Sequence, residues 1–239
     1  MRARRVALVT GGGRGVGRAI AAALAGPAEA VAVHVRRLGT DGEATAGLVR
    51  RAGAESAVFE ADLGDAVRAR DLVRRVVRTF GRVDILVNNV GPILVKPWDA
   101  LSAADWEAMV RGNLLSAYHC LKAVLPGMRR RRWGRIVNLG FGRIEQAAAF
   151  PTILPYAAAK AALLLLTRTA AAAEAGSGVT VNMVSPGLLE GGVLPAGRPV
   201  RPSAVGRPSD VAAAVRFLAS EEASGTTGAN VIVAGTWKM

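Results

Sequence analysis

Tyr156 and Lys160 are two side chains whose types and spacing indicate acid–base chemistry. They stand four residues apart in a segment from Leu154 to Leu163 that enters through Pro155 and continues in alanines and leucines, as helices commonly do. At about 3.6 residues per turn, this spacing puts the phenol and the ammonium on one face of the helix. A tyrosine with a pKa of about 10 exchanges protons poorly at neutral pH unless a nearby positive charge stabilises its phenolate. Alone, the pair is weak support for catalysis, because the same spacing occurs by chance on many helices.

A glycine-rich loop follows the first apolar segment of the chain, Val6 to Val9. Its sequence is Thr10-Gly11-Gly12-Gly13-Arg14-Gly15-Val16-Gly17. Residues without a Cβ atom adopt positive φ angles and let backbone N–H groups approach a pyrophosphate closely. The alanine-rich helix expected next, about residues 18–24, would add the partial positive charge of its first turn. A loop of this kind between a first strand and a first helix indicates dinucleotide binding.

The elements that must position these residues alternate along the whole chain. Strands are expected at residues 6–9, 30–35, 57–60, 83–87, 135–139, 179–184 and 231–233. Helices are expected at residues 18–24, 43–51, 66–80, 103–128 with a fray or kink near Gly112, 154–175, and 210–220 with Ser209 or Asp210 as cap. This alternation predicts an α/β fold in which a parallel sheet of about seven strands has helices on both faces. We find no repeat, linker or shift of composition, so residues 1–239 are expected to form a single domain.

Composition argues against several other classes of protein. No uninterrupted apolar run approaches the roughly 20 residues that cross a bilayer. Met1 to Arg5 leads directly into a strand-like segment, which leaves no room for a signal peptide. The single cysteine, Cys120, excludes an intrachain disulfide and offers no metal cluster. We therefore expect a cytoplasmic protein with no metal site and no membrane partner.

The formal net charge of +13 has two interpretations. It would suit a nucleic-acid partner, or it reflects a preference for arginine on solvated faces. The densest run, Arg129 to Arg132, would suit an anionic partner or form a solvated loop. The other arginines are spread along the chain without interleaved aromatic residues, so we favour compositional bias together with phosphate-bearing ligands, and expect no nucleic-acid partner.

Six pieces of sequence, in order, resemble the short-chain dehydrogenase/reductase family, and the similarity covers nearly the whole chain. They are the glycine loop, Asp62-Leu63, Asn88-Asn89-Val90-Gly91, Asn113, Tyr156-x-x-x-Lys160, and Val181-Asn182-Met183-Val184-Ser185-Pro186-Gly187. The β-ketoacyl-acyl-carrier-protein reductase branch is the most similar. The resemblance implies a Rossmann-type, doubly wound sheet and an oxidoreductase that uses a nicotinamide cofactor.

The resemblance also implies which residues bind the cofactor. They are Thr10, Gly11, Gly15, Val16, Gly17, Asp62, Leu63, Asn89, Gly91, Tyr156, Lys160, Pro186 and Gly187. In such proteins the side chain of Asp62 contacts adenine, although an aspartate here would also serve as the cap of a turn. Asn88 and Asn89 end a strand at the ligand-binding edge of the sheet, and one of them would alternatively brace two neighbouring strands.

Charge argues for the choice of cofactor. A preference for NAD usually requires an acidic residue at the end of the second strand, and here that position is the apolar Val35. Arg36 and Arg37 follow it, and Arg14 lies within the glycine loop. Guanidinium groups form bidentate, charge-assisted bonds to phosphate, so we expect NADP(H), unless these residues only share in the general excess of arginine.

In the reaction that the resemblance implies, Tyr156 donates a proton to a substrate carbonyl oxygen while a hydride reaches the carbonyl carbon. Lys160 would lower the pKa of Tyr156 and hold the nicotinamide ribose. Asn113, facing inward from a bent helix, would hold a water that links Lys160 to solvent. The expected activity is reduction of a 3-oxoacyl thioester or a related ketone.

The sequence departs from the family where a serine usually follows the fifth strand. Counting from the strand places that serine at Phe141, and counting back from Tyr156 places it at Arg143. One lost donor to a developing oxyanion typically costs about 10²–10³ in rate. Three hypotheses stay open. A backbone N–H near residues 140–142 or the side chain of Arg143 replaces the hydroxyl, the substrate needs no such donor, or the protein binds NADPH with little turnover.

Two further expectations concern the surroundings of the site. Residues 188–207 are short, rich in proline and glycine, and carry no hydroxyl just after Gly187, so we expect a small substrate lid and an unusual pocket. Relatives in the family pair through the helices expected here at 103–128 and 156–175, usually as tetramers, so a homotetramer or dimer is expected. His34 and His119 carry no catalytic pattern and are interpreted as structural. The alternative function is a catalytically weak NADP(H)-binding regulatory or scaffold protein.

Overall fold

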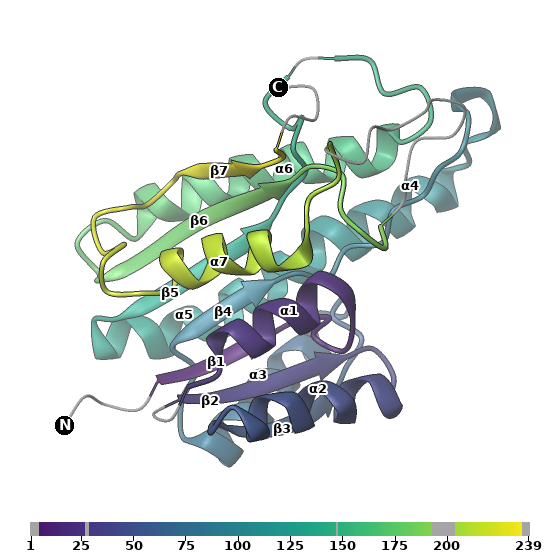
Figure 1. Cartoon of the computed structure of the whole chain (residues 1–239). Helices are drawn as coiled ribbons and strands as arrows, with labels where there is room; N and C mark the ends of the chain where they lie inside the picture. Colours follow the sequence, from purple (N-terminus) through teal and green to yellow (C-terminus); the bar gives the residue numbers. More distant parts are fainter. Residues whose placement is uncertain (1–4, 27–28, 147, 193–203, 236–239) are drawn as a thin grey trace.

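A seven-stranded sheet runs through the molecule and carries the elements that form the site (Figure 1). The computed structural model describes residues 5–26, 29–146, 148–192 and 204–235. The strand order is β3-β2-β1-β4-β5-β6-β7, and each neighbouring pair is parallel. The predicted α/β class with a doubly wound parallel sheet is therefore confirmed.

The strands agree with the sequence prediction to within about two residues at each end. They are β1 Arg5–Val9, β2 Glu29–Val35, β3 Glu55–Glu60, β4 Ile85–Asn88, β5 Gly134–Leu139, β6 Val179–Pro186 and β7 Asn230–Val233. The helices are α1 Gly15–Leu24, α2 Thr40–Arg51, α3 Ala66–Phe80, α4 Ala103–Val110, α5 Ser116–Arg131, α6 Leu154–Ala173 and α7 Pro208–Leu218. A short 3-10 turn, Trp98–Ala100, precedes α4.

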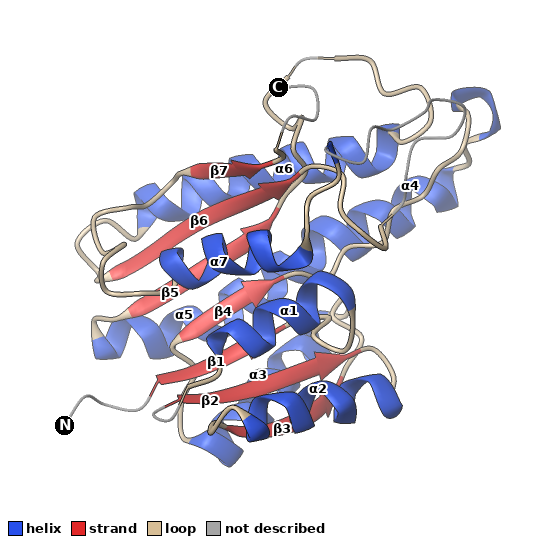
Figure 2. Cartoon of the chain, viewed as in Figure 1, coloured by secondary structure: helices blue, strands red, loops and turns tan. Residues whose placement is uncertain are grey.

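Two apolar layers hold the helices on opposite faces of the sheet (Figure 2). Within β1, Val6 and Leu8 face the layer beneath α3 and α5, whereas Ala7 and Val9 face the layer beneath α1 and α7. Because side chains alternate along a strand and both faces are covered, the strand is apolar without interruption. The same arrangement explains why four of the five residues of β1, Val6 to Val9, form one hydrophobic run.

The long helix expected at 103–128 is interrupted by one wide turn. Residues Arg111–Leu115 form a π-helical segment between α4 and α5. Such bulges are rare and often lie at functional sites, because the extra residue turns side chains away from their regular positions. The kink expected near Gly112 is confirmed, and its physical form is this π turn. Asn113 lies within it and is fully buried.

One predicted cap is wrong. Helix α7 begins at Pro208, and its N-cap is Arg207 rather than Ser209 or Asp210. Proline suits the first helical position because its missing N–H would have no partner there. Asp210 instead occupies the third position, where its carboxylate accepts a hydrogen bond from the Arg207 N–H at 3.0 Å.

No helix in the described ranges is long and apolar enough to pass through a bilayer. The same ranges contain no group of three or more histidine, cysteine or acidic side chains placed to hold a metal ion.

Candidate functional site

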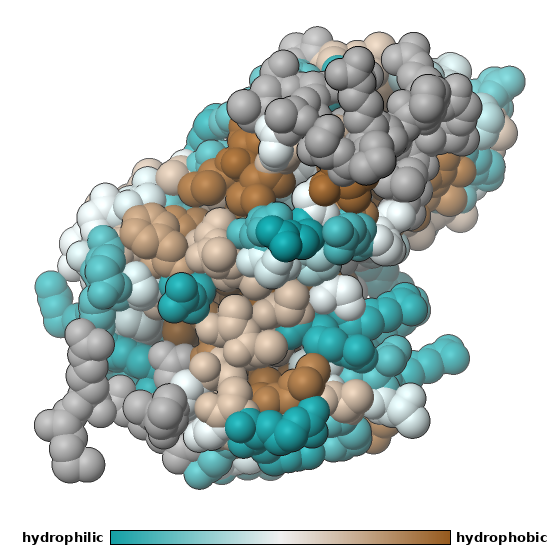
Figure 3. Space-filling view, viewed as in Figure 1, coloured by the Kyte–Doolittle hydropathy of each residue, from teal (hydrophilic) through white to brown (hydrophobic). Residues whose placement is uncertain are grey.

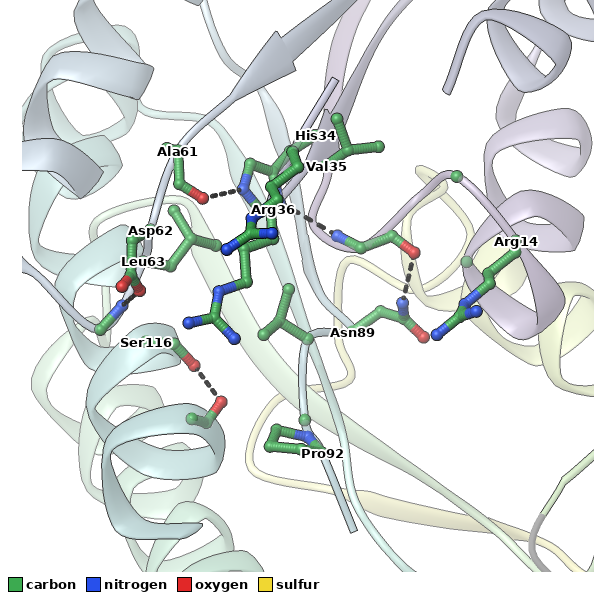
Figure 4. Close-up of a pocket in the computed structure, with 18 of the residues that line it drawn as sticks. Arg14, His34, Val35, Arg36, Ala61, Asp62, Leu63, Asn89, Pro92 and Ser116 are labelled. Carbon is green, nitrogen blue, oxygen red and sulfur yellow. Dashed lines mark hydrogen bonds between the residues drawn. The ribbon is translucent and has the colours of Figure 1, made fainter. Parts of the chain in front are cut away.

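A cavity of about 1110 Å³ opens at the carboxyl ends of β1 to β4 (Figure 4). Its walls are the glycine loop after β1, the residues that follow β2, β3 and β4, and the facing turns of α4 and the π segment. The strand order reverses between β1 and β4, and ligands of open α/β sheets bind at such a switch point. The cavity therefore lies where the sequence places a dinucleotide.

Gly11, the first glycine of the loop, is held by hydrogen bonds to both its N–H and its carbonyl. Gly11 has φ = +63°, its N–H donates to Nδ1 of His34 at 3.1 Å, and its carbonyl accepts from Nδ2 of Asn89 at 3.1 Å. At Gly17 a Cβ would lie 2.2 Å from the Gly11 carbonyl oxygen, so only glycine permits this close approach. These two positions fix the turn from strand to helix.

The middle of the glycine loop is held by side chains of α1 and α2. The Gly13 carbonyl accepts from Arg18 Nε at 3.0 Å, from Arg18 Nη2 at 2.7 Å and from Thr45 Oγ1 at 2.9 Å. In a trans peptide the N–H points opposite to the C=O, so the next N–H, that of Arg14, is directed away from these donors. Within the described ranges the N–H groups of residues 13–16 have no protein acceptor. They are free to bind an anion at the start of α1.

Three guanidinium groups lie around this loop. Arg14, Arg36 and Arg37 all line the cavity and are exposed. In Figure 4, Arg36 extends into the space between Ala61 and Asn89, and Arg14 lies on the other side of the view. None of the three has an ion pair with any described residue, whereas Arg18 pairs with Asp41 at 3.2 Å. The three arginines predicted to bind an anion thus line one cavity and have no ion pair within the described part of the chain.

Asp62 and Leu63 form the opposite wall. The Asp62 carboxylate caps its own turn by accepting from the Gly64 N–H at 3.0 Å, and it lies 3.4 Å from a guanidinium nitrogen of Arg111. The capping role considered for Asp62 is present, and Asp62 also lines the cavity. The Leu63 carbonyl is 3.0 Å from Nδ1 of His119, so its N–H is the backbone group left for a ligand.

The two asparagines at the end of β4 both brace neighbouring segments. Asn88 donates to Oδ1 of Asn138 on β5 at 2.9 Å. Asn89 donates to the carbonyls of Thr10 and Gly11 and also lines the cavity. Thr10 does not line it, because its hydroxyl is buried, donates to the Val87 carbonyl and accepts from the Asn89 N–H.

Tyr156 and Lys160 lie on α6, at the carboxyl end of β5. Helix α6 is fixed to the sheet by a buried chain in which Asn138 donates to Thr167 Oγ1 at 2.9 Å. Lys160 is 3 % exposed, and its Nζ donates to the Leu139 carbonyl at 2.7 Å and lies 5.8 Å from the centre of the Tyr156 ring. The phenol and the ammonium therefore share one face, as their spacing predicts.

Burial governs the acidity of both groups. It raises the pKa of Tyr156 to about 12 and lowers the pKa of Lys160 to about 8. The phenol is thus held in its protonated form, which is the form that donates a proton to a carbonyl oxygen. The lowered pKa of Tyr156 expected from the sequence thus differs from the structure, in which burial raises this pKa.

Asn113 lies close to Lys160. Its Nδ2 donates to the carbonyls of Pro92 and Met109, and its Oδ1 is buried without a partner among the described residues. A Cβ on Gly91 would come within 2.4 Å of Asn113 Oδ1 and 2.9 Å of Lys160 Nζ. Gly91 also lines the cavity, so these residues join the cavity to the Tyr156 side of the site.

Phe141 is one of the two positions, with Arg143, at which the family's serine is expected. Its ring makes an edge-to-face contact with Tyr156 at 5.8 Å between centres, and another with Phe150 at 5.6 Å. Arg143 turns toward Gln146, whose Oε1 accepts from Nε at 2.8 Å, and its guanidinium lies over Phe150. An aromatic ring, rather than a hydroxyl, is therefore the nearest neighbour of the phenol on this loop.

Two of the backbone donors considered for this position are already used. The Gly140 N–H donates to the Val184 carbonyl at 2.8 Å, and the Gly142 N–H donates to the Pro186 carbonyl at 2.7 Å. Gly187 is itself held by the Val233 carbonyl, at 3.0 Å from its N–H. In the expected lid, residues 188–192 and 204–207 are joined by a bridge between Leu189 and Gly206, and residues 193–203 lie outside the described part of the chain.

Two residues of this site were not found by sequence reasoning. His34 was interpreted as structural, yet its ring joins two walls of the cavity. Arg111 lies over Gly64, where a Cβ would meet its Nε at 2.5 Å, and reaches Asp62. Each makes its contact with a segment at least 23 residues away in the chain, and no local pattern announces such a contact.

Comparison with known proteins gives a consistent result. The family described as short chain dehydrogenase matches residues 5–197. A 3-oxoacyl-[acyl-carrier-protein] reductase FabG from Staphylococcus epidermidis is 34 % identical, covering 98 % of each chain. Nodulation protein G from Azospirillum brasilense is also 34 % identical and covers 97 % of each chain.

A solved structure supports the same relationship. It is a putative short-chain alcohol dehydrogenase from Sinorhizobium meliloti, 31 % identical, with a TM-score of 0.88 over 98 % of this chain and 96 % of that chain. Family match, full-length relatives and fold thus agree.

Proposed function

Because the chain belongs to the short-chain dehydrogenase family of oxidoreductases, we propose that it uses NADP(H) to reduce a carbonyl substrate, a 3-oxoacyl thioester or a related ketone. The observation that carries the proposal is the pair formed by Tyr156 and the buried Lys160 beside Gly91, at the end of a cavity edged by free N–H groups and unpaired arginines.

The residues present suit a nicotinamide dinucleotide. The N–H groups of residues 13–16 would bind its diphosphate, because they have no acceptor within the described chain and stand at a helix start. Asp62 and the Leu63 N–H would contact the adenine, and Gly91 leaves room beside Lys160 that a Cβ would fill. Pro186 and Gly187 would lie near the nicotinamide end, as the family resemblance implies.

Arginine placement supports a preference for NADP(H). Arg36 and Arg37 directly follow β2, where an acidic residue would be needed for the ribose hydroxyl of NAD, and Arg14 lines the same cavity. Each offers a planar, permanently charged donor to a 2′-phosphate. Tighter binding of NADPH than of NADH is therefore expected.

When bound, the nicotinamide supplies a hydride at its C4 atom. The hydroxyl of Tyr156 donates its proton to the substrate oxygen, so the carbonyl gains one hydride and one proton and becomes an alcohol. Lys160, with its pKa near 8, would resupply the proton to the phenolate and stabilise its charge. The unpartnered Oδ1 of Asn113 would accept from a water that carries the proton from solvent.

Phe141 sets the chemistry of the substrate pocket. With this ring against Tyr156 and the Gly140 and Gly142 N–H groups occupied, the substrate oxygen would rest mainly on the Tyr156 hydroxyl. We propose an active enzyme that lacks the second donor, and therefore turns over more slowly than it would with a hydroxyl at this place.

The test is NADPH oxidation with a panel of 3-oxoacyl thioesters, ketones, quinones and pterins, alongside titration with NADPH and NADH. Oxidation with at least one carbonyl class, and a lower Kd for NADPH, are expected. NADH bound as tightly as NADPH would refute the cofactor assignment. Tight binding without oxidation across the panel would instead favour the alternative of a regulatory or scaffold protein.

We also propose a cytoplasmic homo-oligomer, a tetramer or dimer. Apolar side chains are exposed on the helices expected to pair, with Tyr118 at 41 % and Leu165 at 66 %. Further apolar surface lies over α7 and β7, where Phe217 and Ile232 are exposed (Figure 3). Light scattering at the mass of one chain would contradict this assembly.

A further inference from the structure

His34 makes one contact with each of two walls of the cofactor cavity. It is the sixth residue of β2 and is 1 % exposed. Its Nδ1 accepts from the Gly11 N–H at 3.1 Å, and its Nε2 lies 3.0 Å from the Ala61 carbonyl oxygen (Figure 4). Gly11 is the first glycine of the loop proposed to bind the diphosphate. Ala61 immediately precedes Asp62 and Leu63, the wall of the cavity proposed to contact adenine.

These two partners settle the state of the ring. A backbone N–H can only donate, so Nδ1 must be an unprotonated acceptor, and a carbonyl can only accept, so Nε2 must carry the hydrogen. The neutral imidazole with hydrogen on Nε2 is the one form that satisfies both contacts. The ring is therefore a fixed spacer between two backbone groups, with both nitrogens in use.

The contact at Gly11 acts at a position of the loop whose backbone conformation favours glycine. This residue has a left-handed backbone, and its carbonyl is held by Asn89. The Gly12 N–H donates to the His34 carbonyl at 2.9 Å, so residue 34 fixes two successive peptides of the loop. Beyond them, the N–H groups of residues 13–16 lack an acceptor in the described chain and remain for a ligand.

We propose that His34 is a positioning residue for the cofactor: its ring sets the conformation of the glycine loop through the Gly11 N–H. The inference rests on the proposed binding of a dinucleotide in this cavity. The contact with Gly11 governs affinity, because it orients the first peptide of the phosphate-binding turn. The contact with Ala61 contributes mainly to the stability of the fold.

Two substitutions separate these contacts. In His34→Asn, Oδ1 stands two bonds from Cβ, as Nδ1 does, and keeps an acceptor for the Gly11 N–H while losing Ala61. In His34→Gln, the amide nitrogen stands three bonds from Cβ, as Nε2 does, and keeps a donor for Ala61 while losing Gly11. Each variant loses one hydrogen bond, so their thermal stabilities should fall by similar amounts.

The affinity for NADPH, measured by the fluorescence of the cofactor, is expected to differ between the two variants. The asparagine variant should keep the wild-type Kd within about threefold, and the glutamine variant should raise the Kd by about tenfold or more, because the Gly11 N–H loses its acceptor. Equal weakening in both variants, or weakening that follows their melting temperatures, would overturn the proposal.

Amide hydrogen exchange of the protein without cofactor gives a second and independent measurement. The Gly11 amide should exchange faster in His34→Gln than in the wild type, and at an unchanged rate in His34→Asn. If the wild type fails to bind NADPH, the proposed function fails, and the exchange rates still decide this inference. Equal Gly11 exchange in the two variants would refute it.

Discussion

The two ends of the site differ in how closely they keep to the chemistry of the family. At the cofactor end, the glycine loop is held by His34, Asn89 and Arg18, and its binding groups are left free. At the reacting end, Tyr156 and Lys160 are in place, but Phe141 packs where a hydroxyl donor is expected. The proposed cofactor site is thus preformed on the sheet, while the loop proposed to meet the substrate carries an aromatic ring. Binding and turnover should consequently respond to different substitutions.

The largest expected effect separates the ends at Tyr156. Tyr156→Phe removes only the hydroxyl, so kcat for the best carbonyl substrate should fall by about 10²–10⁴. The Kd for NADPH should change less than twofold, because the ring and its contact with Phe141 remain. Steady-state kinetics and cofactor titration measure the two quantities, and turnover retained by the variant would remove Tyr156 from the mechanism.

Phe141→Ser tests whether the reacting end lacks a donor. A hydroxyl beside Tyr156 should raise kcat by up to about 10²–10³, since it would stabilise charge developing on the substrate oxygen. Phe141→Ala is the matched control, because it opens the same space without a hydroxyl. If both variants behave alike in single-turnover assays, another group already supplies the donor.

Arg36→Asp tests the cofactor end alone. The exchange replaces a charge-assisted donor by a like charge, so NADPH affinity should fall by about 10- to 100-fold and NADH affinity should hold or improve. Arg51→Asp, at the end of α2, is a control on an exposed arginine away from the cavity. Unchanged NADPH affinity in Arg36→Asp would contradict the assignment of the 2′-phosphate to this arginine.

The smallest expected effect concerns stability in acid. Burial lowers the pKa of His34 to about 4, with Arg75 also lowering it and the Ala61 carbonyl and Asp62 opposing the shift. Because the folded pKa lies below the ordinary value of 6.5, the unfolded chain binds more protons, and stability falls as pH drops from 6.5 toward 4.

Between pH 7 and 5.5 this single group should cost about 1 kcal/mol of unfolding free energy. Denaturant unfolding at the two pH values measures the loss, and His34→Asn should show a smaller loss because it has no imidazole to protonate. An equal loss in both proteins would show that other groups cause the acid dependence.

Local patterns predicted the elements whose ends are set locally. Helix α3 was predicted at its observed bounds from apolar residues at helical spacing, and in the structure Asp65 caps its first turn through bonds to the Val67 and Arg68 N–H groups. Gly81 then ends it in a left-handed conformation. Helix α2 begins three residues before its predicted start, since Gly42 packs against Val58 on β3, a contact that sequence does not display.

The residues of the site likewise divide into those that local sequence predicts and those that depend on contacts between distant segments. The glycine loop, the asparagines and the Tyr156–Lys160 spacing could be predicted, because they lie in short runs of chain. The roles of His34 and Arg111 could not, because each depends on a segment brought near only by the fold. The hydrogen-bond acceptors of the Gly140 and Gly142 N–H groups could likewise not be predicted, since β6 supplies them.

The π turn at Arg111–Leu115 has a consequence for how the chain tolerates change. Deleting one residue there would let α4 and α5 join in regular α-helical hydrogen bonding, which is locally the more favourable geometry. The same deletion would rotate Asn113 away from Lys160, or Arg111 away from Asp62, by roughly 100°. A shortened variant is thus expected to be inactive without being less stable. The π turn thus keeps Asn113 and Arg111 in place at a cost in helix stability.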